Sequence, residues 1–215
     1  MKNKFALLVP AICLVMLSAF SVSAKADTLT LLGTSSNTVG YDPIYPYYLS
    51  VNGSSTATNM MCLDLNRFVN NGETWTATLF NWSSPSSAIK TQYEEEAYIF
   101  SQLSGSSYSV ADIQLAAWDI FDPAGVASLV ASNSLSMTPI NTLVTTAAST
   151  IGSLPLSFFQ GFSIYVADTT DPQNWQGNGI PQDFISAVPE PSSLMLFGSG
   201  LVGLAGIARR KLARS

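Results

Sequence analysis

The sequence predicts an α+β fold, in which a β-rich, sandwich-like domain carries a helical insert between flanking segments that lie outside the fold. Three observations predict it. Alternating hydrophobicity fills the first part of the domain, helix-start signatures follow in the middle, and alternation returns near residue 160. Each end of the chain combines an apolar stretch with basic residues. The predicted boundaries are 1–26 for the leading segment, 27–187 for the domain and 188–215 for the trailing segment.

The leading segment, residues 1–26, has the layout of a secretory signal peptide. Lys2 and Lys4 precede an apolar stretch over residues 5–20, and Ala-Lys-Ala at 24–26 is a small-residue cleavage site. The stretch is short for a helix that crosses a membrane. We therefore expect signal peptidase to remove it during export, with an uncleaved membrane anchor as the alternative.

Strand patterns dominate the first part of the domain and return near its end. In one of them Cys62 and Asp64 are two residues apart, so they are predicted to share a strand face. Residues 41–51 are aromatic, but Pro43 and Pro46 restrict them to an edge strand or a loop. The predicted strands are 28–32, 59–68, 74–80 and 158–167.

Helix signals occupy the middle of the domain. Residues 91–94 and 109–112 read as capping boxes, in which a Ser or Thr is followed three residues later by an acidic residue. The second box leads into a helix over 113–121, which Asp-Pro at 122–123 should end. Residues 138–151 are a weaker helix candidate. The middle of the chain therefore predicts the helical insert.

Charge and composition exclude several classes of function. Residues 27–188 hold thirteen acidic and two basic residues, a net charge of −11. Such a surface repels nucleic acid and anionic membranes, so we expect no nucleic-acid partner. The chain has no histidine, which excludes Ser-His-Asp and Cys-His catalytic sets and imidazole metal sites. We therefore expect no turnover enzyme, no metal and no cofactor.

The trailing segment has three parts: a Pro-Glu-Pro motif, an apolar run over 194–208 and a basic tail. The combination resembles the PEP-CTERM sorting signal of bacterial exported proteins. The resemblance implies an exosortase as partner, transient anchoring in the inner membrane by a transmembrane helix, and transfer to the cell surface or extracellular matrix. A simple C-terminal membrane anchor is the alternative. The sorting residues are Pro189, Glu190, Pro191, Arg209, Arg210 and Lys211.

One thiol remains after the leader is removed, Cys62. Exported proteins normally pair their thiols, so a single one is buried and inert, joined to another chain or chemically committed. On the second predicted helix, Gln114 and Trp118 are four residues apart and share a face. A glutamine beside an apolar stripe is costly unless its amide is hydrogen-bonded.

Three motifs in order resemble the bacterial Cys-Gln thioester domain of surface adhesins. They are Met-Cys-Leu-Asp at 61–64, Glu-Ala-Tyr-Ile-Phe at 96–100 and Ile-Gln-Leu-Ala-Ala-Trp at 113–118. The resemblance spans about residues 59–121.

That resemblance implies an internal thioester between the sulfur of Cys62 and the acyl carbon of Gln114, formed with loss of ammonia. Trp118 and Tyr98 would shield the bond from water. Asp64, on the predicted strand face of Cys62, would orient or deprotonate a nucleophile, with a solvated or turn-capping carboxylate as the alternative. The predicted function is attachment of an exported surface or matrix protein, with an amine-bearing surface molecule or an exopolysaccharide as partner. The alternative is a non-reactive structural or glycan-binding matrix protein, in which Cys62 is a plain apolar residue and Gln114 a satisfied core amide.

Overall fold

The computed structural model describes residues 26–170 and 179–188, so the predicted signal peptide and sorting helix lie outside the described residues. The barrel strands are β1 (Asp27–Thr34), β4 (Tyr47–Val51), β5 (Thr58–Cys62), β6 (Thr74–Leu79), β7 (Phe162–Ala167) and β8 (Phe184–Ala187). They close an antiparallel barrel in the order β1-β4-β5-β8-β7-β6, and β2 (Thr38–Val39) pairs with β3 (Asp42–Pro43) beside it. Within these ranges no helix is both long and apolar enough to cross a membrane.

The α+β class is confirmed, but a closed barrel replaces the predicted sandwich. Closure depends on β8, which pairs with β5 on one side and β7 on the other. This strand is four residues long and follows a turn-rich stretch, so alternation did not mark it. A register shift between Leu31 and Gly33 of β1 breaks the regular pairing with β4, and such an irregularity increases bending of the strand. Closure leaves the six barrel strands without an unpaired edge.

The prediction for residues 41–51 is wrong in its second half. Residues 47–51 form β4, which is a strand of the barrel wall and pairs with β1 on one side and β5 on the other. Pro46 stands immediately before the first strand residue, where its missing N–H costs no ladder hydrogen bond.

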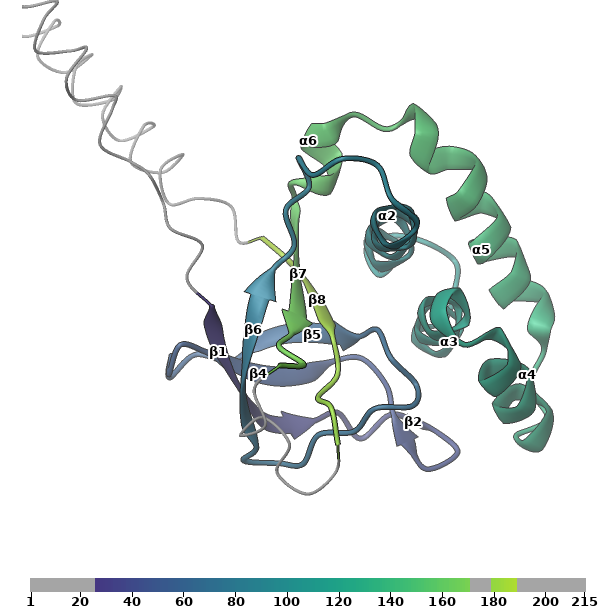
Figure 1. Cartoon of the computed structure of the whole chain (residues 1–215). Coiled ribbons are helices and arrows are strands. Elements are labelled where there is room, and N and C mark those ends of the chain that lie inside the picture. The colour runs from purple at the N-terminus through teal and green to yellow at the C-terminus, as the bar shows by residue number, and fades with distance from the viewer. Residues whose placement is uncertain (1–25, 171–178, 189–215) are drawn as a thin grey trace, which may run out of the picture.

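The helical insert lies between β6 and β7, as predicted, and stands on one side of the barrel (Figure 1). Its first helix begins earlier than expected, because Ser87 rather than Thr91 caps it by accepting the N–H of Lys90 at 3.2 Å. The insert consists of α2 (Ala88–Ser101), α3 (Val110–Phe121), α4 (Pro123–Ser132), α5 (Met137–Thr150), the 3₁₀ turn η1 (Ile151–Ser153) and α6 (Leu156–Phe159).

The start of α3 is confirmed in detail. Ser109 accepts the N–H of Asp112, and Asp112 accepts the N–H of Ser109, which is the reciprocal capping box. Helix α4 was not predicted. Asp122 ends α3 and caps α4 at once, and Pro123 at the first helical position suits a helix start because its ring presets the backbone.

The core fills the barrel and the layer between the barrel and the helices. Met60, Met61 and Cys62 are consecutive residues of β5, yet all three have no exposed surface. Alternate side chains of a strand point to opposite faces, so both faces of β5 are covered. This double cover places Cys62 in the interior rather than at the surface.

Candidate functional site

The structure brings Cys62 and Gln114 together. Cys62 is the last residue of β5, and Gln114 lies in the second turn of α3, 52 residues later. The side-chain Nε2 of Gln114 donates a hydrogen bond to the main-chain oxygen of Cys62 at 2.7 Å. Both residues are completely buried. The amide of Gln114 is therefore held against the cysteine residue inside the core.

A second hydrogen bond fixes the other end of the same amide. The backbone N–H of Tyr45 donates to Gln114 Oε1 at 3.2 Å. Gln114 thus links α3, the end of β5 and the segment that leads into β4. Both polar atoms of the amide are therefore hydrogen-bonded, and these bonds offset the free-energy cost of burying the amide. The acyl carbon of Gln114 lies between the two bonded atoms.

The thiol of Cys62 faces the backbone of the next turn. Its Sγ donates to the carbonyl oxygen of Asp64 at 3.1 Å and accepts the N–H of Asp64 at 3.4 Å. Burial raises the pKa of the Cys62 thiol well above its usual value, and the backbone of Asp64 and the indole of Trp118 only partly offset this. The proton therefore stays on the sulfur at neutral pH.

Trp118 and Tyr98, the two predicted shielding residues, differ in their placement. Trp118 is 1% exposed, one helical turn after Gln114, and its indole favours the thiolate of Cys62. Tyr98 is half-buried on α2 and packs against the core. No hydrogen bond within the described part of the chain joins Tyr98 to Cys62 or Gln114. Trp118 alone is therefore associated with the thiol.

Asp64 does not share a strand face with Cys62, because β5 ends at Cys62. Its side chain accepts the N–H of Asn66 at 2.9 Å, a local turn that competes with strand pairing. Its other oxygen pairs with Arg67 Nε at 2.8 Å. Asp64 therefore contacts Cys62 through its backbone, while its carboxylate faces Arg67.

A polar cavity of about 530 Å³ is lined by Leu63 and Asp64, the two residues that follow Cys62, but not by Cys62 itself. Asp64 and Asp183, which line it, both act electrostatically on Cys62 and raise its pKa. Asp183 accepts the N–H of Ala167 at 2.8 Å and the hydroxyl of Tyr93 at 3.1 Å, and burial raises the pKa of its carboxyl. The charged and aromatic lining residues are Asp64, Arg67, Tyr93, Phe121, Asp122 and Asp183.

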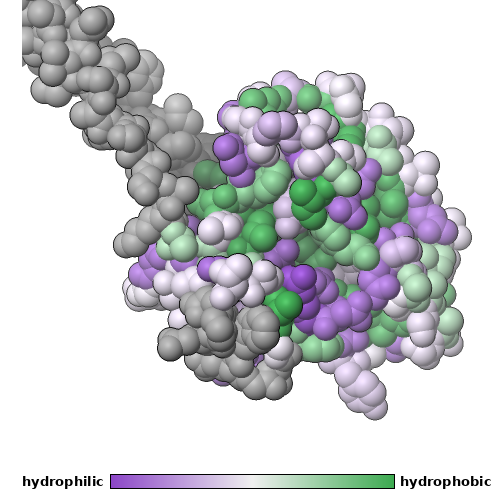
Figure 2. Space-filling view, in the orientation of Figure 1, coloured by the Kyte–Doolittle hydropathy of each residue, from purple (hydrophilic) through white to green (hydrophobic). Residues whose placement is uncertain are grey.

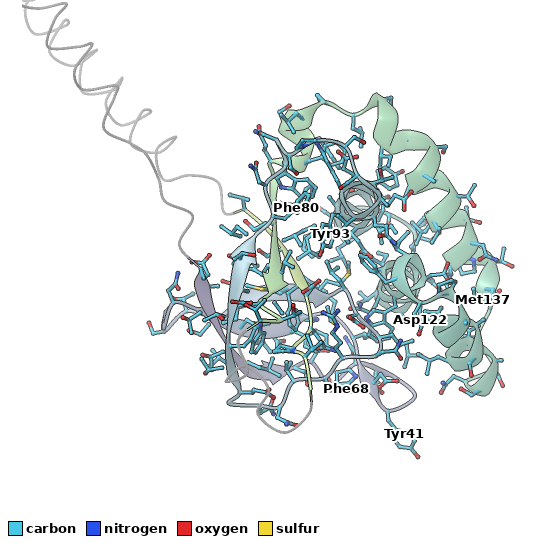
Figure 3. All side chains as sticks on the ribbon, viewed as in Figure 1. Tyr41, Phe68, Phe80, Tyr93, Asp122 and Met137 are labelled. Carbon is cyan, nitrogen blue, oxygen red and sulfur yellow. The ribbon has the colours of Figure 1, made fainter. Side chains whose placement is uncertain are left out.

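The polar cavity was not predicted from the sequence. In Figure 2 hydrophilic side chains gather on the near face between the barrel and the helices, and Figure 3 labels Tyr93 and Asp122 in this region. One indication of Arg67 as a site residue lay in the sequence, because it is one of only two basic residues between 27 and 188. Asp183 carried none, because it precedes the strand that alternation missed.

A second cavity, of about 620 Å³, has no charged residue in its lining. The ring of Tyr45 meets Phe100 edge-on, with centroids 6.0 Å apart, and Phe100 meets Phe162 in the same way at 5.9 Å. Tyr45 lines this cavity, and its N–H also holds Gln114. Its other lining residues are Ala57, Thr58, Asn59, Ser101, Leu103, Ser104 and Ala187.

One segment of the chain matches a known family. Residues 187–211 match the PEP-CTERM protein-sorting motif. The match begins at the last residue of β8 and includes the Pro-Glu-Pro motif and the basic residues up to Lys211. It confirms the predicted sorting signal, which implies an exported surface protein that is anchored transiently in the membrane and processed by an exosortase. No curated protein and no solved structure matches the chain, and the thioester-domain resemblance gains no support from these comparisons.

Proposed function

We propose that this exported protein attaches covalently to amine-bearing molecules through an internal thioester between Cys62 and Gln114. One observation carries the proposal: the side-chain amide of Gln114 lies 2.7 Å from the main-chain oxygen of Cys62, inside the core. A glutamine amide that is held against the residue carrying the lone thiol, in a buried site, brings the two groups that a thioester needs into neighbouring positions. The attached partner is an amine-bearing surface or matrix molecule.

The bond forms when the Cys62 sulfur adds to the acyl carbon of Gln114. The new S–C bond replaces the C–N bond, and the thiol proton leaves with the amide nitrogen as ammonia. A primary amine can later add to the same carbon. An amide then forms at Gln114, the S–C bond breaks, and a proton from the amine restores the Cys62 thiol. Each chain reacts once, so the protein is not a turnover enzyme.

The surroundings of the pair support this chemistry. Burial keeps water away from the bond. Water would otherwise hydrolyse the thioester and leave glutamate at position 114. The polar cavity lined by Leu63 and Asp64 holds three carboxylates, of Asp64, Asp122 and Asp183, against the single guanidinium of Arg67. Excess negative charge in a cleft concentrates cations, including protonated primary amines. The cavity would therefore gather protonated amines beside the residues that follow Cys62 in the chain.

The test is the intact mass of the mature protein. We expect a mass lower than the sequence mass by one ammonia, and we expect Cys62→Ala and Gln114→Ala each to abolish that deficit. Gln92→Ala is the matched control, because Gln92 is also a helix glutamine with a bonded amide, donated to the carbonyl of Ile120 at 3.3 Å. It should keep the deficit. Methylamine should add at Gln114 and release one titratable thiol.

Full sequence mass with an unmodified glutamine at position 114 would refute the thioester. Peptide mapping distinguishes a thioester that never formed from one that was hydrolysed, because hydrolysis would leave glutamate at position 114. No other thiol remains between residues 27 and 188, so no disulfide within the chain can mimic the loss of the free thiol.

The uncharged cavity favours a second function, non-covalent binding of a neutral glycan. Its rings at Tyr45, Phe100 and Phe162, together with the amide of Asn59, are the side-chain types that contact sugars. Titration with neutral exopolysaccharide fragments, followed by Trp fluorescence, tests it. Binding that survives Cys62→Ala but is lost in Asn59→Ala would support this function, and the absence of any saturable signal would refute it.

A further inference from the structure

The uncharged cavity lies at one end of the barrel. Strand β8 runs antiparallel to both β5 and β7, so its last residue lies at the same end as the first residues of those two strands. Thr58, Phe162 and Ala187 occupy these three positions, and all of them line the cavity. Figure 1 shows the start of β7 and the end of β8 together at this end of the barrel. The cavity is therefore beside the point at which the chain leaves the fold.

The polar cavity lies at the opposite end. Strand β5 ends at Cys62, and the next two residues, Leu63 and Asp64, line the polar cavity. Ala167 is the last residue of β7, Asp183 directly precedes β8, and both line it as well. The barrel thus has a charged end and an uncharged end, and the sorting signal follows from the uncharged one.

The fold holds the chain up to the edge of the sorting signal. The N–H of Val188 donates to the main-chain oxygen of Gly161 at 2.9 Å. The apolar run of the signal begins six residues later, at Leu194. Six residues span at most about 22 Å when fully extended, and the headgroup layer on one side of a bilayer occupies about 5–8 Å of this distance. While the signal anchors the protein, the uncharged end is therefore held close to the bilayer surface.

The distribution of charge agrees with this orientation. No charged residue lines the uncharged cavity, whereas three carboxylates line the polar cavity. An anionic bilayer surface repels carboxylates. The charged end is therefore favoured away from the bilayer, and the lining of the uncharged cavity can approach the surface without this repulsion.

We propose that the membrane anchor closes the uncharged cavity to polymers and that cleavage by the exosortase opens it. In the anchored protein the gap between cavity and bilayer admits a small molecule but leaves too little room for a long chain. Cleavage removes the tether and frees this end of the barrel. The inference supplies the regulation of the proposed glycan binding, and it rests on that function only for the identity of the polymer. The polar cavity, at the other end, is open to polymers before and after cleavage.

Cysteine labelling tests the proposal on the full-length protein, purified from cells without the exosortase and reconstituted in nanodiscs that contain anionic lipid. The released form comes from cells that express the exosortase. Both forms carry Cys62→Ala, which leaves residues 27–188 without a thiol, and Ala57→Cys, at an exposed residue of the uncharged cavity. N-ethylmaleimide is the small probe, and maleimide-linked polyethylene glycol is the polymer probe. We expect the nanodisc form to react with the small probe and to lose labelling by the polymer, whereas the released form should react with both.

Two controls isolate the effect of the membrane. Thr169→Cys is the matched position, because Thr169 is also exposed but lines the polar cavity just after β7. It should react with both probes in both forms. The second control inserts a Gly-Ser linker of about twenty residues between Val188 and Pro189, which adds a mean reach of about 25 Å and keeps the anchor. This linker should restore labelling of Ala57→Cys by the polymer in nanodiscs.

The outcomes separate this proposal from glycan binding. Equal polymer labelling of Ala57→Cys in the nanodisc and released forms overturns the proposal, and so does a released form that the polymer cannot label. A linker that does not restore labelling, or a Thr169→Cys variant that is masked to the same extent, also overturns it, because closeness of the uncharged end to the membrane is then not the cause. A released protein that labels as expected but gives no saturable signal with neutral exopolysaccharide fragments refutes the glycan function and leaves the masking standing.

Discussion

Glu96 on α2 is a carboxylic acid enclosed in the core. It has no exposed surface, and neither of its side-chain oxygens has a hydrogen-bond partner in the described part of the chain. Burial raises the pKa of its carboxyl well above the usual value, and the neighbouring charge of Glu95 adds to the effect. We predict that Glu96→Met stabilises the protein at neutral pH.

The sign follows from proton binding. Above the ordinary pKa of glutamate the unfolded chain has lost this proton, while the folded protein keeps it up to its raised pKa. The folded state then binds more protons, so the contribution of Glu96 to stability falls as pH rises through this window. Below the ordinary pKa both states are protonated, and the contribution no longer depends on pH.

The magnitude follows from the two unpartnered oxygens. Leaving a buried polar group unsatisfied costs about 1–3 kcal/mol. Methionine has a similar unbranched chain and a similar helix propensity, so Glu96→Met removes that cost with little change in shape. The free energy of unfolding should rise by at least this amount at pH 7. For a domain of this size each 1 kcal/mol raises Tm by roughly 2–4 °C.

Urea unfolding of the wild type, Glu96→Met and Glu96→Gln at several pH values between 4 and 8 measures the effect. Both variants should remove the decrease in stability with rising pH that Glu96 causes. Glu94→Met is the control. Glu94 lies on the same helix and is more exposed, and its carboxylate pairs with Lys90 Nζ at 3.9 Å, so its charge is not left without a partner. Its effect should stay within about 0.5 kcal/mol. A Glu96→Met variant that is less stable than the wild type at pH 7 would refute the reasoning.

Two further predictions concern α4 and the sorting signal. A methyl group at Gly125 would run into the Asp122 carboxylate, which caps α4 by accepting the Gly125 N–H at 2.9 Å. Gly125→Ala should therefore cost about 1 kcal/mol in urea unfolding, whereas Gly152→Ala, with open space around it, should not; equal stability of the two variants would contradict this. Replacing the basic residues 209–211 by glutamine should impair retention and processing, as measured by immunoblots of cell fractions with and without the exosortase. Normal maturation of that variant would show that the sorting interpretation is wrong.

Local signals were sufficient for several features of this protein. The capping box at Ser109 and Asp112 predicted the start of α3, because both partners lie within one turn of the chain. The period of apolar residues predicted β1, β6 and α5 to within a few residues. The sorting signal at 187–211 was also readable, since its motif, apolar run and basic tail are contiguous. By itself, the sequence thus determined the start of α3, the period of several strands and the sorting signal.

The tertiary structure alone decided the barrel and the buried site. Closure needs β8 between β5 and β7, and four residues of strand after a turn-rich stretch carry too little local pattern to predict a pairing. The same holds for Gln114, whose hydrogen bonds reach residues 52 and 69 positions away in the chain. Such contacts depend on how α3 packs across the end of β5, and no local propensity specifies that packing. The sequence therefore predicted Cys62 and Gln114 as a pair only by resemblance, whereas their hydrogen bonding and the Tyr45 donor follow from the fold.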